Sequence, residues 1–156
     1  MIRRATEKDI PEINNLLRQV LTIHADIRPD IFKADTKKYT DEELKAIILD
    51  DTKPILVSTD ESDRAVGYAF LVIEEIHDSN ILCDEKSIYI DDLCVDEKYR
   101  GKHIAKELYE YIKGYAKNIG CNTITLNVWE GNEDAYAFYR AMGLRPRKHE
   151  MEVRLY

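Results

Sequence analysis

The sequence predicts a mixed α/β protein with one domain over residues 1–156. Its 156 residues, of which 44% are hydrophobic, suffice for one domain with a substantial core. Segments with helical spacing of apolar residues and segments with strand-like alternation follow one another in the order β-α-α-β-β-β-α-β-α-β. No apolar run approaches the roughly 20 residues that a membrane-spanning helix needs. The order of the elements therefore favours a mixed sheet with helices packed on it.

The first half of the chain predicts an edge strand, two helices and a hairpin. Residues 1–5 are the expected edge strand, and an apolar stripe from Ile10 to Leu21 predicts the first helix. Thr40 opens a capping-box pattern before the second helix. Residues 23–38 have no clear period, so we expect a loop or irregular helix there, a kind of segment that often lines a site. Two strand-like runs, 54–58 and 65–76, predict a hairpin.

The strand expected at 86–95 changes phase in its middle. Its apolar residues fall on even positions up to Ile90 and on odd positions from Leu93 onward. One extra residue at Asp91-Asp92, a β-bulge, would produce that slip. Two adjacent carboxylates in an otherwise apolar strand are unfavourable unless they reach water or partners.

The second half of the chain predicts two more helices and two more strands. An apolar stripe from Ile104 to Ile119 predicts a long helix that ends at Gly120. Clean alternation over 122–128 predicts a strand, and Asn132 is the expected N-cap of the last helix. The tail 149–156 alternates again and is expected to be a final strand.

Charge and cysteine content exclude several classes of function. The net charge is −7, from 30 acidic and 23 basic side chains, whereas a nucleic-acid binder needs a basic face, so no nucleic-acid partner is expected. No membrane partner is expected either, because no apolar run is long enough to span a bilayer, and the first residues lack the apolar core of a secretion signal. The cysteines show no CxxC spacing, which disfavours a disulfide framework and a zinc site and makes the cytoplasm the default location.

The segment between the bulged strand and the long helix carries a candidate anion site. It is Arg100-Gly101-Lys102-His103-Ile104-Ala105. Free N–H groups at a helix N-terminus, together with the helix dipole, attract phosphate. The segment lacks the glycine spacing of a P-loop and of the Rossmann dinucleotide motif. Taken alone, it is equally compatible with a surface turn.

A second segment downstream gives this loop its context. It is Asn132-x-x-Ala135-x-x-Phe138-Tyr139-x-x-x-Gly143-Leu144. With the loop, the opening residues 2–9 and the order of elements, it resembles the GNAT family of N-acetyltransferases. The resemblance implies a mostly antiparallel central sheet with flanking helices and splayed central strands. It also implies acetyl-CoA as the cofactor.

The resemblance implies a set of cofactor contacts. The family's pyrophosphate signature, Gln/Arg-x-x-Gly-x-Gly/Ala, matches the loop except that His103 replaces the first glycine. In the family the pantetheine arm pairs with the bulged strand, where the N–H of Cys94 would polarise the thioester carbonyl. The implied cofactor contacts are Leu93, Cys94, Val95, Arg100, Gly101, Lys102, His103, Ile104, Ala105 and Asn132.

The resemblance also implies catalytic residues. Tyr139 matches the tyrosine that protonates the departing thiolate. A base is needed because a primary amine is mostly protonated at pH 7. Tyr89-Ile90-Asp91-Asp92-Leu93 resembles a strand of spermidine/spermine acetyltransferases, so Asp91, acting through water, is the first candidate base, Asp92 the second and Glu75 the third. Alternatively, Asp92 binds the bulge N–H groups and Asp91 is merely solvated.

These observations predict acetyl transfer from acetyl-CoA to the primary amine of a small cationic acceptor, in a ternary complex. A protein or peptide amine is the alternative acceptor. A non-catalytic CoA-binding sensor and an unrelated α/β interaction domain are the alternatives from other classes, and the latter would not bind CoA. Dimers are common in the family, so a homodimer is expected, and no metal is expected because no histidine has a companion at ligand spacing.

Overall fold

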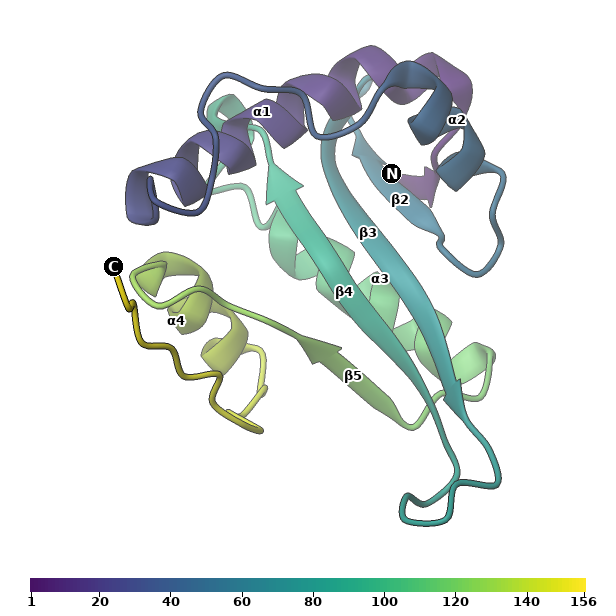
Figure 1. The fold of residues 1–156 in the computed structure, drawn as a ribbon. Helices are drawn as coiled ribbons and strands as arrows, with labels where there is room; N and C mark the ends of the chain where they lie inside the picture. Colours follow the sequence, from purple (N-terminus) through teal and green to yellow (C-terminus); the bar gives the residue numbers. More distant parts are fainter.

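The computed structural model describes residues 1–156 and contains one five-stranded sheet (Figure 1). The strands lie in chain order, and every neighbouring pair is antiparallel except β4 and β5, which are parallel. The strands are β1 (Ile2–Arg4), β2 (Ile55–Thr59), β3 (Ala65–Ile76), β4 (Glu85–Val95) and β5 (Thr123–Leu126). The predicted mixed α/β class with a mostly antiparallel sheet is confirmed.

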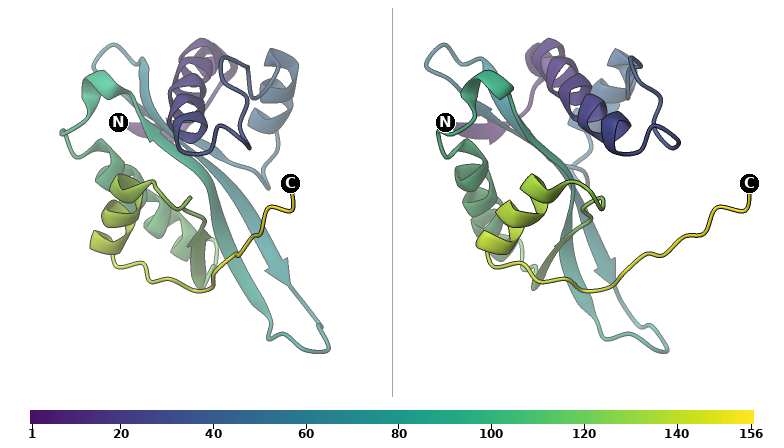
Figure 2. Two further views of the ribbon diagram at one scale, coloured as in Figure 1. Left: turned by 60° about the vertical axis from the view of Figure 1, so that its left-hand side comes forward. Right: turned by 90° about the vertical axis from the view of Figure 1, so that its left-hand side faces the viewer.

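Helices cover both faces of this sheet (Figure 2). The helices are α1 (Ile10–Ile27), α2 (Asp41–Ile48), α3 (Ile104–Asn118) and α4 (Glu133–Ala141), with short 3₁₀ turns η1 (Glu7–Asp9) and η2 (Glu97–Tyr99). α1 and α2 pack on one face in a core that includes Tyr68 and Cys94. α3 packs on the other face in a second core that includes Ile88 and Ile90, with α4 at its margin. The sheet therefore separates two apolar layers.

The two predicted N-cap residues, Thr40 and Asn132, form capping hydrogen bonds in the structure. Thr40 Oγ1 accepts a hydrogen bond from the N–H of Glu43 at 3.1 Å at the start of α2. Asn132 Oδ1 accepts from the N–H of Ala135 at 3.4 Å at the start of α4. The aperiodic segment expected to begin at residue 23 begins later, because α1 continues to Ile27.

The final strand expected at 149–156 is absent. Residues 144–156 follow α4 without regular structure and extend away from the body of the protein (Figure 2). Alternation creates two faces on an extended chain, but a strand also needs a neighbour for its N–H and C=O groups. The tail pairs with no strand of its own chain, so its sequence pattern is not expressed as a strand.

The predicted bulge is confirmed by the register of β3 and β4. Phe70 pairs with Asp92, whereas the next residue, Leu71, pairs with Ile90. Asp91 is thus the extra residue. An extra residue exchanges the two faces of a strand beyond it. Even-numbered residues of β4 therefore point toward α3 before the bulge and toward α1 after it.

The splayed central strands are also confirmed. β4 pairs with β5 only from Ser87 to Ile90, whereas it pairs with β3 as far as Val95. Residues 91–95 thus have a β3 neighbour on one side and no strand on the other. The splay begins at the bulge.

Gly67 allows α3 to lie close to the sheet where β4 ends. A Cβ atom added to it would lie 3.2 Å from the carbonyl oxygen of Cys94 and 3.4 Å from side-chain atoms of Ile104 and Leu108. By contrast, a Cβ added to Gly114, within α3, would have no atom within 4 Å. The two glycines offer a matched comparison.

We expect Gly67→Val to lower the free energy of unfolding by about 1–3 kcal/mol, because the added carbons overpack this junction. Gly114→Ala, the control, is expected to raise it by about 0.5–1 kcal/mol, because alanine favours a helix interior. Urea denaturation measures both. Unchanged or greater stability of Gly67→Val would contradict the close packing of α3 on β3.

Candidate active site

The bulge places the carboxylate of Asp92 on the α1 side of the sheet. Without the extra residue, Asp92 would share the face of Ile88 and Ile90 in the α3 core. Instead it accepts a hydrogen bond from the hydroxyl of Tyr68, at 2.7 Å between Oη and Oδ2. Tyr68 is fully buried in β3. The bulge thus keeps the carboxylate of Asp92 out of the apolar α3 core and places it where Tyr68 donates a hydrogen bond to it.

Asp92 lies in an environment that makes it more basic than an ordinary carboxylate. Burial raises its pKa, although the hydrogen bond from Tyr68 and the charges of Lys38 and His24 oppose that shift. Burial lowers the pKa of His24, with Asp92 opposing the change. Burial also acts to lower the pKa of Lys38, but Asp92, Tyr39 and Asp91 outweigh it and raise that pKa. A protonated lysine therefore stands beside the carboxylate pair.

Asp91 has a different environment from Asp92. It is exposed, and its Oδ2 lies 3.7 Å from Nζ of Lys38. The third candidate base, Glu75, lies near the far end of β3, opposite Lys86. Its carboxylate contacts His77 at 2.8 Å and Lys86 at 3.4 Å. The structure brings Asp91 and Asp92 together but not Glu75.

The β4 backbone beyond the bulge offers hydrogen-bonding groups on its unpaired side. The N–H of Asp96 donates to the carbonyl of Val66 on the β3 side, at 2.9 Å. In an antiparallel ladder the bonding direction alternates, so the backbone groups of Cys94 face β3 and those of Leu93 and Val95 face the unpaired side. The side chain of Arg100 reaches the carbonyl of Val95 at 3.4 Å, which agrees with this direction. The role assigned to the N–H of Cys94 from sequence fits Leu93 or Val95 better.

The side chain of Cys94 packs in the core. It is 5% exposed, and Sγ lies 3.8 Å from the carbonyl oxygen of Leu16. Burial, with a further contribution from Asp92, raises the pKa of the Cys94 thiol to about 12. At neutral pH the thiol remains protonated, which is unsuitable for a nucleophile.

Tyr139 belongs to the same electrostatic environment although it comes from α4. Burial raises the pKa of its hydroxyl, with Asp92, Tyr109 and Cys94 adding to the shift. Its ring packs edge-on against Phe138, with centroids 5.1 Å apart. At neutral pH this phenol retains its proton. A phenol that holds its proton therefore lies within the electrostatic influence of the Asp92 carboxylate.

The loop before α3 has the geometry of an anion site. Gly101 has φ of 78°, and His103, the N-cap residue of α3, has φ of 62°. His103 thus occupies a left-handed conformation where the family signature has glycine, at a penalty of about 1–2 kcal/mol for a side chain. Its side chain is exposed and forms no cap hydrogen bond, so it does not occupy the first backbone N–H groups of α3.

A hollow of about 370 Å³ lies between the end of α1 and the start of α4. Its lining is rich in carboxylates and includes the predicted cofactor residue Asn132. The lining residues are Ile23, Asp26, Ile27, Gly131, Asn132, Glu133 and Asp134. The aromatic rings of His24, Phe32 and Trp129 also join α1 to the segment after β5, with successive centroids 5.1 and 5.2 Å apart.

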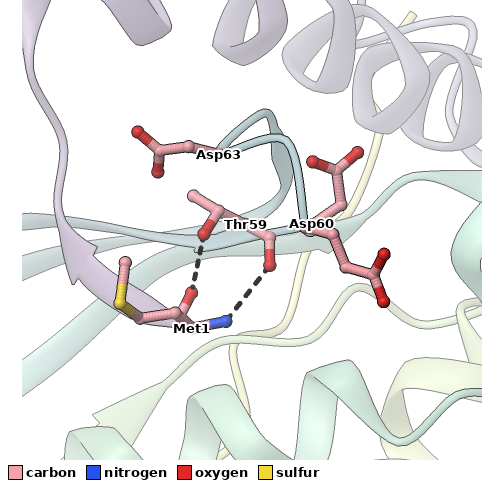
Figure 3. A pocket seen from close by; sticks show the side chains of 5 residues that line it. Met1, Thr59, Asp60 and Asp63 are labelled. Carbon is pink, nitrogen blue, oxygen red and sulfur yellow. Dashed lines mark hydrogen bonds between the residues drawn. The ribbon is translucent and has the colours of Figure 1, made fainter.

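A larger hollow, of about 490 Å³, lies at the β2–β3 turn (Figure 3). Met1 and Thr59 are bonded to each other in its wall, with the N-terminal amino group 3.1 Å from the carbonyl of Thr59. Asp63 already pairs with Arg3 and Lys8. Asp60 accepts from the N–H groups of its own turn. The acidic side chains that line this hollow would repel the phosphates of the cofactor, so the hollow does not suit acetyl-CoA.

Sequence reasoning missed three residues that surround the carboxylate pair. Tyr68 belongs to an apolar strand run, in which nothing marks one tyrosine as polar. His24 and Lys38 come from the aperiodic stretch, whose lack of period was the only available signal.

The structure contains no group of three or more His, Cys, Asp or Glu side chains arranged to hold a metal ion. None of its helices combines the length and apolar character needed to cross a membrane.

Comparison with known proteins identifies relatives over most of the chain. The model of the acetyltransferase (GNAT) family matches residues 17–144. Thialysine N-epsilon-acetyltransferase of Bos taurus is 26% identical over 152 residues, which is 92% of this chain and 82% of that protein.

Solved structures agree with this match. A mutant of the BH1408 protein from Bacillus halodurans is 32% identical and superposes with a TM-score of 0.95, covering 100% of this chain and 99% of that one. The aminoglycoside N-acetyltransferase AAC(6')-Iy, in complex with CoA, shares the fold with a TM-score of 0.72 at 17% identity, covering 99% and 98% of the two chains. With the splayed strands and the loop before α3, the family match shows that this chain belongs to the GNAT family of acetyl-CoA-dependent N-acetyltransferases.

Proposed function

We propose that the protein transfers an acetyl group from acetyl-CoA to the primary amine of a small cationic acceptor, by direct attack in a ternary complex. The observation that carries this proposal is the position of Asp92. Asp92 lies in the part of β4 beyond its pairing with β5. Its carboxyl group has a raised pKa and is near the protonated phenol of Tyr139. A base and an acid thus flank one stretch of free backbone, as amine acetylation requires.

The residues present fit the cofactor. Bound acetyl-CoA would supply the acetyl group as a thioester. The loop from Arg100 to Ala105 would hold the pyrophosphate through N–H groups at the start of α3. The backbone groups of Leu93 and Val95 that face away from β3 would bind the pantetheine arm, and one of their N–H groups would stabilise negative charge developing on the thioester carbonyl oxygen. Asn132 would contact the arm from the other side.

The carboxylates of Asp91 and Asp92 would have different roles toward the amine of the acceptor. We assign proton acceptance to Asp92, because burial raises the pKa of its carboxyl group. Asp91 is exposed beside Lys38 and would attract the incoming ammonium or act through a water molecule. Tyr139 would then give its proton to the leaving sulfur.

The acceptor class rests on charge and on the relatives. The hollow at the start of α4 is lined by Asp26, Glu133 and Asp134, which favours a cationic molecule. Relatives are named for thialysine and aminoglycosides, both of them small amines. The proposal includes a cytoplasmic location, which suits three free cysteines, and a homodimer.

An acceptor panel tests the proposed activity and its base together. We expect CoA thiol release to be greater with polyamines, lysine analogues or aminoglycosides than with neutral amino acids or peptides. The rate is expected to rise with pH through an ionisation above the usual Asp pKa of ~3.9, because the deprotonated form of Asp92 is the active one. Asp92→Asn should lower kcat/KM by roughly 10²–10⁴-fold and abolish that ionisation.

Asp91→Asn is the matched control on the neighbouring residue. We expect a smaller fall in kcat/KM, through KM, with the ionisation retained. If Asp91→Asn abolishes the ionisation and Asp92→Asn does not, the roles are reversed. If the protein binds CoA but acetylates no acceptor of the panel, the alternative function of a non-catalytic CoA-binding sensor is favoured.

Tyr139→Phe tests the general acid, because it removes only the hydroxyl. With saturating acetyl-CoA we expect kcat to fall roughly tenfold or more, about 1.4 kcal/mol in barrier height, with little change in KM for acetyl-CoA. Tyr136→Phe is a suitable control, since Tyr136 lies on the same helix and is 49% exposed. An unchanged kcat in Tyr139→Phe, with chemistry rate-limiting, would show that another group protonates the thiolate.

A further inference from the structure

Tyr68 places a hydroxyl group inside the apolar α1 core. Its side chain is fully buried, and its ring packs edge-on against Phe70 with centroids 5.0 Å apart. A buried hydroxyl is unfavourable without a hydrogen-bond partner, and its partner here is Oδ2 of Asp92, at 2.7 Å. A phenylalanine ring would fill the same space, so the hydroxyl group acts through the carboxylate rather than through packing.

The bulge in β4 creates this hydrogen bond. Asp92 pairs with Phe70 across the ladder, and Cys94 pairs with Tyr68. Tyr68 and Asp92 are therefore diagonal neighbours on one face of the sheet, a separation that a long aromatic side chain can span. Without the extra residue, Asp92 would lie on the opposite face, out of reach of the hydroxyl group.

The two oxygens of the Asp92 carboxylate have different surroundings. Oδ2 accepts the hydrogen bond from Tyr68, whereas Oδ1 accepts none from the protein. The only buried side-chain oxygen or nitrogen without a partner is Oδ1 of Asn14. Oδ1 of Asp92 is therefore accessible to solvent, and the Asp92 side chain as a whole is half-buried. One oxygen is held from the core side and the other is open.

We propose that Tyr68 is a positioning residue for acetyl transfer: it holds Oδ2 of Asp92, so that the open Oδ1 is the oxygen that accepts the amine proton. This inference rests on the proposed function. A proton passes from the acceptor nitrogen to Oδ1, the nitrogen bonds to the acetyl carbon, and the C–S bond breaks with its electron pair going to sulfur. Tyr68 keeps its own proton, because burial and the charge of Asp92 hold the pKa of its phenol well above the usual value.

The same hydrogen bond affects the ionisation of Asp92. A donated hydrogen bond stabilises the charged carboxylate, so it lowers the pKa of Asp92 against the larger effect of burial. Loss of the hydroxyl group would raise that pKa further. The other titratable groups that interact electrostatically with Asp92 are Asp91 and Cys94 of β4, His24 of α1, Lys38 and Tyr39 of the segment after α1, and Tyr139 of α4. Tyr68→Phe leaves all of these groups in place.

The pH dependence of kcat/KM in Tyr68→Phe tests the inference. We expect the ionisation to move upward by roughly one to two pH units, the range for losing a hydrogen bond to a charged group. Above the new midpoint, where Asp92 is ionised in both proteins, we expect kcat/KM to stay roughly tenfold below wild type, because the carboxylate is no longer oriented. The control, Tyr109→Phe, removes the hydroxyl group of a buried tyrosine in the α3 core and should leave the midpoint unchanged.

The outcomes separate this inference from the proposed function. A folded Tyr68→Phe that is less stable but keeps the wild-type midpoint would show a purely structural tyrosine and overturn the inference alone. A midpoint that moves to lower pH would also overturn it. If the wild type acetylates no acceptor, the proposed function and this inference both fail.

A measurement on the wild type applies even if Tyr68→Phe does not fold. NMR of protein that is ¹³C-labelled at the tyrosine Cζ atoms follows each phenol through a pH titration. We expect the Tyr68 signal to shift at the same pH as kcat/KM, because its hydrogen bond strengthens when Asp92 ionises, and we expect this shift to vanish in Asp92→Asn. A Tyr68 signal that does not change over this pH range would overturn the inference.

Discussion

The site depends on one extra residue in β4. Asp91 has no partner of its own in β3, and its insertion reverses the faces of β4 from that point on. Before it, Ile88 and Ile90 fill the α3 core; after it, Asp92 and Cys94 face α1. Without the insertion a carboxylate would be buried among aliphatic side chains, at a large penalty. The bulge converts that conflict into a polar position with Tyr68 as its partner.

The same bulge is where β4 leaves β5. Pairing with β5 ends at Ile90, and from there the outer side of β4 has no strand neighbour, although β3 still holds the inner side. Backbone groups that a closed sheet would satisfy are available to a ligand, at the position where Asp92 and Tyr139 share one electrostatic environment. The proposed cofactor contacts and the proposed proton transfer groups thus come together because one strand is irregular.

Periodicity predicted most of the fold because it reports on which side of an element is buried. It located the bulge, since a change of phase is visible in one strand. Capping residues located the starts of α2 and α4 at Thr40 and Asn132. It did not locate Lys38 or Tyr68 at the site, because long-range contacts leave no local pattern. It was wrong about the last strand, because alternation shows that a segment has two faces, not which strand it pairs with.

Amide exchange measured by NMR tests directly which amides of β4 face the cofactor. Without CoA, the amide of Cys94 should exchange slowly because it donates to β3, whereas those of Leu93 and Val95 should exchange faster. Saturating CoA should slow Leu93 or Val95 and leave Cys94 unchanged. Equal protection of all three amides without CoA, or slowing of Cys94 alone when CoA is added, would contradict the splayed edge as the cofactor site.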